Sequence, residues 1–230
     1  MLRLIIITID GPAASGKSTV ARMLAKKFSF YYLSSGLLFR ALVYILVHHF
    51  NYSKEQLLQP HQDDLKKALD LKRFSYQYDA TAQEQILFDG INITRFLKDK
   101  EISDYASLIA TNELVRDALA TLQHQIAQNH NLVAEGRDMG SVIFPYADVK
   151  FFLTASLQAR ALRWVKDRQG KGITISLEQA GKEIEERDER DSVRSIAPLQ
   201  IPEGAIVIDD SDLTPEQVVQ KMEDTLPKVI

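Results

Sequence analysis

Near its start the chain reads Gly11-Pro12-Ala13-Ala14-Ser15-Gly16-Lys17-Ser18-Thr19. This is the spacing G-x-x-x-x-G-K-[ST] of the phosphate-binding loop. The apolar, β-branched run 4–9 before it predicts a buried parallel strand, and the apolar positions of 20–28 recur at helical spacing. The motif therefore lies between a strand and a helix, which is the context it needs to bind the phosphates of a nucleoside triphosphate.

The residue types of this loop explain how it binds phosphate. Its glycines let the backbone turn tightly and approach an anion, and successive N–H groups at the helix N-terminus point at the phosphate oxygens. Lys17 adds a positive charge at the outer phosphates, and the Ser18 hydroxyl is a ligand for Mg²⁺. A glycine-rich turn that binds nothing has no need of a lysine followed by a serine, so we expect residues 11–19 at the triphosphate site.

The composition is that of an ordinary globular protein and excludes several classes of function. Of the 230 residues, 45% are hydrophobic and 26% charged, and the net charge of −3 argues against a bulk nucleic-acid binder. The absence of cysteine excludes disulfides, thiolate catalysis and cysteine-bound zinc. The N-terminal apolar run is too short for a signal peptide, and no stretch reaches the ~18 apolar residues of a membrane span. We therefore expect a cytoplasmic protein with neither a membrane nor a nucleic acid as partner.

Strands and helices are predicted to alternate along the chain. The predicted core strands are residues 4–9, 30–33, 132–134, 149–153 and 205–208. Such alternation is typical of an α/β fold, here a five-stranded parallel sheet of the P-loop NTPase type, covered by helices on both faces. Residues 72–92 differ, because their alternating pattern and the turn signal Asp89-Gly90 indicate a small antiparallel sheet. With a helix predicted over 53–69, this sheet forms an insertion in the parallel core.

The predicted second strand ends at Ser34-Ser35-Gly36, and a helix is predicted to follow over 37–46. We expect Ser35 to cap this helix, with Arg40 little more than one turn further along. A capped helix N-terminus with a nearby arginine suits a phosphate monoester. An ordinary N-cap with a surface arginine explains the same residues, and the sequence leaves both interpretations open.

The long helical stretch over 103–130 carries Ser107 and Arg116, which lie nine residues apart. On one straight helix this spacing places them on different faces. They can share a ligand only if the helix breaks between them, and Thr111-Asn112 is the expected place for the break.

Arg137 and Asp138 follow the predicted strand 132–134 directly. In open α/β sheets, ligands bind beyond the carboxyl ends of the strands, so these side chains are expected beside the phosphate-binding loop. A lone acid and arginine pair is often a surface ion pair of little consequence. The flanking glycines and the position directly after a buried strand favour a functional site here.

The segment 156–195 is predicted to form two helices, one opening at Ser156 and one at Ser176, with a break at 170–172. Positions i, i+3, i+4 and i+7 of the second helix hold Arg187, Arg190, Asp191 and Arg194. A solvated helix with ion pairs along one face is the alternative interpretation. A triphosphate site upstream favours a closing lid instead, because phosphoryl transfer needs positive charge around the transferred group.

These features together resemble the bacterial cytidylate kinases, a branch of the nucleoside monophosphate kinases, over nearly the whole chain. The resemblance rests on Ile9-Asp10-Gly11-Pro12, on Ser35-Gly36 with Arg40, on Glu135-Gly136-Arg137-Asp138-Met139-Gly140 with Val142, Phe144 and Pro145, and on Arg187-Asp188 through Asp191 and Arg194 to Ala197-Pro198-Leu199. It implies transfer of the γ-phosphoryl group of ATP to CMP or dCMP, giving ADP and CDP or dCDP, with Mg²⁺ as cofactor. No general base is expected, because the acceptor phosphate oxygen is already anionic.

The resemblance also implies roles for individual residues. The implied catalytic cations are Lys17, Arg137, Arg187 and Arg194, and Arg163 is implied on the ATP side. At the acceptor nucleotide, Ser35 and Arg40 are implied as ligands, with Arg40 at the phosphate together with Arg137 and Arg194. The residues implied at cytosine are Ser107, Arg116 and Asp138. Those implied at the sugar are Arg187 and Asp191. A carboxylate that accepts from the cytosine 4-amino group should reject uracil, which has a carbonyl at that position.

The implied organisation is a single domain over 1–230 that functions as a monomer. Its expected parts are a core of about 1–35, 102–155 and 196–230, an NMP-binding region with the insertion over about 36–101, and a lid over about 156–195.

Four positions depart from the family pattern. Ser34 stands where Asp is usual, Phe39 where Tyr is usual, Lys98 where Arg is usual, and Trp164 where the second Arg of a pair is usual. Ser34 and Lys98 bear on acceptor binding and on contacts between the regions, and Trp164 offers a ring that can stack on adenine.

Two other functions fit the phosphate-binding loop by itself. One is a kinase of a different small acceptor, such as a hydroxy acid, against which the pairing of Arg116 with Asp138 speaks. The other is an ATP-dependent switch or motor, against which the clustered lid arginines speak.

Overall fold

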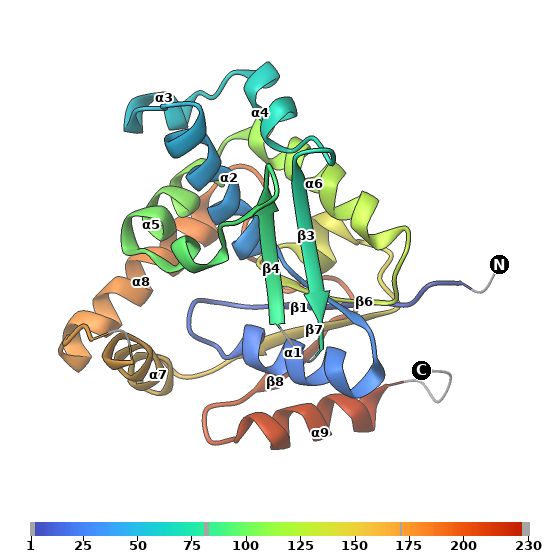
Figure 1. The fold of residues 1–230 in the computed structure, drawn as a ribbon. Helices are drawn as coiled ribbons and strands as arrows, with labels where there is room; N and C mark the ends of the chain where they lie inside the picture. Colours follow the sequence, from blue (N-terminus) through green and yellow to red (C-terminus); the bar gives the residue numbers. More distant parts are fainter. Residues whose placement is uncertain (1–2, 81–82, 171, 227–230) are drawn as a thin grey trace.

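The computed structural model describes residues 3–80, 83–170 and 172–226. At its centre is a five-stranded parallel sheet with the order β2-β6-β1-β7-β8, which confirms the predicted α/β core (Figure 1). The strands are β1 (Ile6–Asp10), β2 (Tyr31–Ser34), β6 (Leu132–Gly136), β7 (Val149–Thr154) and β8 (Ile206–Asp209). Each lies within two residues of its predicted position.

The register of the sheet brings the functional loops together at one edge. Asp10 at the end of β1 is paired with Gly136 on β6, and Ser34 at the end of β2 is paired with Glu135. The phosphate-binding loop, the start of α2 and the loop after β6 therefore all leave the same carboxyl edge, where ligands of such sheets bind.

Helices cover both faces of the sheet, as predicted. Helices α1 (Lys17–Phe28) and α9 (Pro215–Thr225) share one apolar core with the central strands, and both lie at the bottom of Figure 1. On the other face, α2 (Ser35–His49) and α6 (Glu113–Ala127) belong to a second and larger core with α5 (Lys100–Ile109). No helix of the described ranges is both long and apolar enough to cross a membrane.

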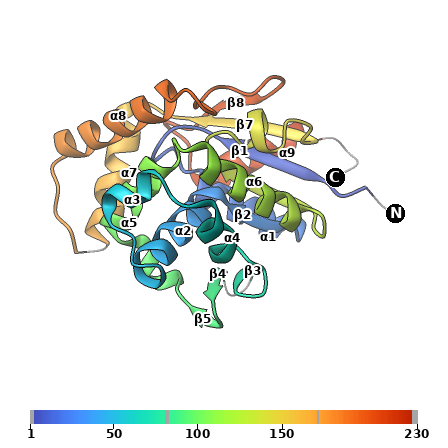
Figure 2. The same ribbon diagram turned by 90° about the horizontal axis from the view of Figure 1, so that it is seen from above.

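The insertion contains the predicted antiparallel sheet, made of β3 (Phe74–Asp79), β4 (Gln83–Phe88) and β5 (Ile91–Asn92). These strands lie at the bottom of Figure 2, and β3 packs against β2, the edge strand of the parallel sheet, where the Tyr31 hydroxyl donates to the Tyr76 carbonyl at 2.8 Å. Asp89 and Gly90, at φ 48° and 79°, make the turn between β4 and β5. A short 3₁₀ helix, η1 (Thr94–Lys98), leads back to α5.

The single helix predicted over 53–69 is wrong. The structure has two short helices there, α3 (Lys54–Leu58) and α4 (Gln62–Ala68). Pro60 lies between them, and it has no N–H to donate and disfavours helical backbone at the residue before it. Gln59 is accordingly non-helical, with φ −136° and ψ 65°.

The predicted break at Thr111-Asn112 is confirmed, because it separates α5 from α6. The Asn112 side chain caps α6 by accepting from the Val115 N–H at 3.2 Å. The two helices predicted over 156–195 are also confirmed, as α7 (Leu157–Gln169) and α8 (Leu177–Val193), which extend to the left of the sheet in Figure 1 and are called the lid below. A single π-helical turn, η2 (Met139–Ile143), follows β6.

Gly11 is the glycine whose replacement is expected to cost most. Its φ is +150°, and a Cβ added there would lie 2.0 Å from the Leu153 carbonyl oxygen. We expect Gly11→Ala to lower the free energy of unfolding in urea by about 2–4 kcal/mol, because backbone strain and overpacking add. Gly90→Ala is the matched control: its φ is +79°, but no atom lies within 4 Å, so a loss of only about 1 kcal/mol is expected. Equal losses would contradict the steric argument.

Candidate active site

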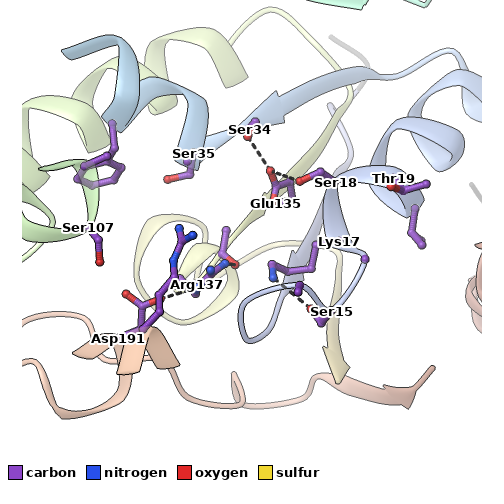
Figure 3. Close-up of a pocket in the computed structure, with 18 of the residues that line it drawn as sticks. Ser15, Lys17, Ser18, Thr19, Ser34, Ser35, Ser107, Glu135, Arg137 and Asp191 are labelled. Atoms are coloured by element: carbon purple, nitrogen blue, oxygen red, sulfur yellow. Dashed lines mark hydrogen bonds and ion pairs between the residues drawn. The ribbon is translucent and has the colours of Figure 1, made fainter. Parts of the chain in front are cut away.

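A cavity of about 570 Å³ opens at the carboxyl edge of the sheet, between the phosphate-binding loop, α2, α5 and the lid (Figure 3). The residues predicted from the sequence that line it are Ala14, Ser15, Gly16, Lys17, Ser18, Thr19, Ser35, Arg40, Ser107, Arg116, Arg137, Asp138, Arg163, Arg187, Asp191 and Arg194. Gly11, Pro12 and Ala13 are not among the lining residues. They shape the first half of the loop, where the Pro12 carbonyl accepts from Ser15 Oγ at 3.0 Å.

Lys17 is held at the base of the cavity by its own loop. Its Nζ donates to the Pro12 carbonyl at 2.6 Å and to Ser15 Oγ at 3.1 Å. Its side chain is only 5% exposed. Burial, and after it the positive charge of Arg137, lowers the pKa of Lys17 well below its ordinary value. An ammonium in this position gains from an anionic ligand, which would offset both effects.

Glu135 is a buried carboxylate at the end of β6 for which the sequence reasoning assigned no role. Its Oε1 accepts from Ser34 Oγ at 2.6 Å and from Ser18 Oγ at 3.0 Å, as the dashed lines in Figure 3 show. Burial works to raise the pKa of Glu135, but the Lys17 charge and these hydrogen bonds hold it below its ordinary value. Glu135 is the penultimate residue of β6 and is paired with Ile9 of β1, so it lies near the edge of the sheet from which the phosphate-binding loop leaves.

The prediction that Ser35 caps α2 is wrong, because the N-cap is Ser34. Ser34 is the last residue of β2 and keeps an extended backbone, with φ −100° and ψ 107°, while Ser35 is already helical. The Ser34 Oγ accepts from the Leu37 N–H at 3.3 Å and still donates to Glu135. The Ser35 hydroxyl is therefore not occupied by capping, and Ser35 and Arg40 both line the cavity.

Three arginines converge on the cavity beside Lys17. Arg137 follows β6, Arg40 lies on α2, and Arg187 lies on lid helix α8. Burial, followed by the charges of Arg137 and Arg40, lowers the pKa of Arg187 to about 10, and burial also lowers the pKa of Arg40. Arg137 is balanced by Asp191, with 2.8 Å between its Nε and Oδ2, but the buried Nε of Arg187 has no hydrogen-bond partner among the described residues. The cavity thus has an excess of positive charge.

A second polar cluster lies further from the phosphate-binding loop. Asp138, which is 3% exposed, accepts from Arg116 Nη2 and lies 3.5 Å from Arg194 Nη2. Arg116 Nη1 donates to the Ala110 carbonyl at 3.1 Å, which fixes the guanidinium across the break between α5 and α6. The break brings Ser107 and Arg116 to one cavity, and the buried Ser107 hydroxyl has no hydrogen-bond partner among the described residues.

The loop that carries Asp138 is anchored by a buried acid on β1. Asp10 accepts from the Met139 N–H at 2.8 Å and from the Gly140 N–H at 2.7 Å. Burial raises the pKa of Asp10 to about 6. The two hydrogen bonds attach the residues after Asp138 to the strand that leads into the phosphate-binding loop.

The lid also lines the cavity on the side of α9. Arg163 Nη1 donates to Asp210 Oδ1 at 2.9 Å, and its Nη2 donates to the Asp210 carbonyl at 2.7 Å. Trp164 lines the cavity too, while its Nε1 donates to Glu183 of α8 at 3.0 Å. Arg190, on the predicted face of α8, is exposed and is not one of the lining residues.

Comparison with known proteins identifies the family of this chain. The cytidylate kinase family model matches residues 7–228. The cytidylate kinase of Streptococcus pneumoniae serotype 19F (strain G54) is 38% identical over 221 residues, which cover 96% of this chain and 96% of the relative. That of Marinomonas sp. (strain MWYL1) is 40% identical over 215 residues, covering 94% and 92%. A shikimate kinase from Acinetobacter baumannii, solved with shikimate, overlaps 97% of this chain and 96% of its own at 11% identity, with a TM-score of only 0.44.

Proposed function

Since this chain belongs to the cytidylate kinase family, we propose that it transfers the γ-phosphoryl group of ATP to CMP or dCMP, giving ADP and CDP or dCDP. The observation that carries the proposal is the cavity itself. One space is lined by the phosphate-binding lysine, by the arginines of α2 and of the lid, and by the Arg116–Asp138 pair. A donor triphosphate and an acceptor nucleotide supply the negative charge that this space lacks.

The acceptor phosphate is proposed to bind among Arg40, Arg137 and Arg194, with Arg187 and Asp191 at the sugar. Support comes from the lowered pKa values of Arg40, Arg187 and Arg194, to each of which burial contributes most. A dianionic phosphate would neutralise these partly desolvated cations. Ser35, with its hydroxyl free of capping, is proposed to donate to the same nucleotide.

Cytosine is proposed to bind at Ser107, Arg116 and Asp138. A carboxylate accepts from the 4-amino group, and an arginine or a hydroxyl donates to the acceptor edge of the base. The unpartnered Ser107 hydroxyl supports this placement, since a buried hydroxyl without a partner is costly unless a ligand supplies one.

The donor ATP is proposed to bind along residues 11–19, with Arg163 beside it. Mg²⁺ fits the oxygen atoms of Ser18 and Glu135, because hydroxyl and carboxylate oxygens are the ligands it prefers. When bound with ATP, Mg²⁺ neutralises charge on the β- and γ-phosphates. Among the described residues no group of three or more His, Cys, Asp and Glu side chains gathers as a metal site.

Catalysis is proposed to consist of alignment and charge stabilisation in a direct in-line transfer. Lys17, Arg137, Arg187 and Arg194 surround the transferred group, and no general base is needed because the attacking phosphate oxygen is anionic. The lid arginines must close over the acceptor to exclude water, which would otherwise accept the phosphoryl group. A monomeric state and a cytoplasmic location both stay predictions.

The proposal is tested by coupled ADP release from Mg-ATP with CMP, dCMP, UMP, AMP, GMP and no acceptor in parallel. We expect CMP and dCMP to exceed the other acceptors by about 10²-fold or more in kcat/KM, because a buried carboxylate left unpaired opposes uracil. Turnover of UMP equal to that of CMP would remove the role of Asp138. ADP release that needs no acceptor would identify an ATPase instead.

A further inference from the structure

Two lid side chains hold the backbone of Ala13, at the start of the phosphate-binding loop. The Ala13 N–H donates to Asp188 Oδ1 at 2.7 Å, and the Ala13 carbonyl accepts from Arg160 Nη1 at 3.2 Å. Arg160 on α7 and Asp188 on α8 also form an ion pair with each other. We call these two side chains and the Ala13 backbone the Ala13 clamp. It joins both lid helices to the loop that carries Lys17.

The clamp is protected from water. The side chains of Arg160 and Asp188 are 12% and 17% exposed. The Ala13 methyl group, 2% exposed, packs in a small apolar cluster with Ala161, Ala180 and Ile184 of the lid. Charged hydrogen bonds are stronger where water is excluded, so the clamp is well placed to fix the lid against the loop.

Neither clamp side chain belongs to the residues that line the cavity. They therefore act on the reaction through other groups. Asp188 directly follows Arg187 in α8, and Ala13 precedes Lys17 by four positions in the loop. The clamp consequently ties the turn of α8 that carries Arg187 to the loop that carries Lys17.

This closeness is opposed by repulsion between like charges. The charges of Arg137 and Arg187 both act to lower the pKa of Lys17, after the larger effect of burial, and Asp188 acts in the opposite direction on Lys17 and on Arg187. Without a negative charge at this point, the repulsion between the loop and the lid favours an open lid.

We propose that Asp188 and Arg160 are positioning residues, which hold the lid on the phosphate-binding loop so that Arg187 stays beside Lys17 despite their repulsion. This inference rests on the proposed phosphoryl transfer. The inference goes beyond that function because it assigns closure of the lid to a contact with the Ala13 backbone. This contact involves no atom of either substrate. Loss of the clamp should reduce transfer and let water compete for the phosphoryl group.

The test compares Asp188→Asn with Glu189→Gln, which removes the same charge from an exposed neighbour on α8. We expect Asp188→Asn to lower kcat for CMP by about 10- to 100-fold, because small displacements of aligned groups cost this much. The KM for ATP should stay near that of the wild type, and the ratio of acceptor-independent ADP release to transfer should rise. Glu189→Gln should behave as the wild type in each assay.

A second readout reports the lid directly. Trp164 is the single tryptophan of the chain and packs against the same apolar cluster as Ala13. Its fluorescence in the absence of nucleotide should shift in Asp188→Asn toward a more exposed tryptophan, with no shift in Glu189→Gln. A merely structural role would lower the thermal midpoint without changing the ratio of hydrolysis to transfer.

Arg160→Met and the double variant Asp188→Asn/Arg160→Met complete a double-mutant cycle. This cycle remains informative if one of the variants folds poorly. Because both side chains act through one clamp, the double variant should lose little more activity than either single variant. Additive losses, or a wild-type ratio of hydrolysis to transfer in Asp188→Asn, would overturn the clamp. Absence of CMP phosphorylation by the wild type would instead refute the proposed function, so the two failures are distinguishable.

Discussion

Replacing Lys17 by alanine is expected to lower kcat with CMP by about 10³- to 10⁵-fold, the range found when a cation at the transferred phosphoryl group is lost. The Lys17 ammonium lies at the base of the cavity, held by the Pro12 carbonyl and Ser15 Oγ. In this partly desolvated position its charge acts more strongly on a developing anion than it would in water. Steady-state kinetics with saturating Mg-ATP measure the effect.

The same substitution is expected to leave the protein folded and as stable as the wild type, or more stable. Burial lowers the pKa of Lys17 from 10.5, so the unfolded chain binds its proton more tightly than the folded chain. At pH 7 the buried charge therefore costs stability, and stability from this group rises with pH until the unfolded lysine loses its proton near 10.5. Removing the charge removes the cost.

Lys26→Ala is the control for this experiment, since Lys26 is an exposed lysine of the same helix. It should keep wild-type turnover. Thermal unfolding of both variants separates a chemical defect from a folding defect. Turnover of Lys17→Ala within about tenfold of the wild type would contradict the role given to this ammonium.

Much of the fold could be predicted from local sequence patterns. The β-branched runs marked the parallel strands, and Asp89-Gly90 marked the turn from β4 to β5 because both residues take positive φ. The break between α5 and α6 was predictable because Asn112 prefers to cap a helix. This break also explains why Ser107 and Arg116, nine residues apart, line one cavity.

The N-cap of α2 could not be predicted from local sequence. Ser34 and Ser35 are equally good N-caps by residue type. The choice is made by the sheet, because pairing with β6 keeps Ser34 extended and leaves Ser35 as the first helical residue. Pairing of this kind joins segments about a hundred residues apart, which no window of sequence contains.

The parts of the site that sequence reasoning missed are carboxylates that face other parts of the chain. Glu135 was visible in the motif after β6, but its contact with Ser18 depends on the neighbouring strand. In the sequence, Asp188 is one of several acids on a charged helix. Its hydrogen bond to the Ala13 N–H joins residues 175 positions apart. The cations of the cavity were predictable from phosphate chemistry, whereas the contacts of Glu135 and Asp188 depend on tertiary structure.

Replacing Asp138 by asparagine is expected to lower kcat/KM for CMP by about 10²- to 10³-fold and to lower it for UMP far less. The carboxylate is 3% exposed and faces Arg116 and Arg194. In the proposed complex the carboxylate accepts from the cytosine amino group, whereas the amide of the variant can donate to the uracil carbonyl. The preference for cytosine should therefore collapse.

A loss of stability should accompany this change in specificity. Without the carboxylate, the Arg116 and Arg194 cations lose their common partner in a buried position, which costs about 3–5 kcal/mol in the free energy of unfolding. Saturating Mg-ATP and a temperature well below the midpoint keep the variant folded during the assay. Asp117→Asn, an exposed acid next to Arg116 on α6, is the control and should change neither property. If kcat/KM for CMP and UMP fell by the same factor, Asp138 would hold the two arginines without reading the base, and the discrimination would have to come from Ser107 and Arg116.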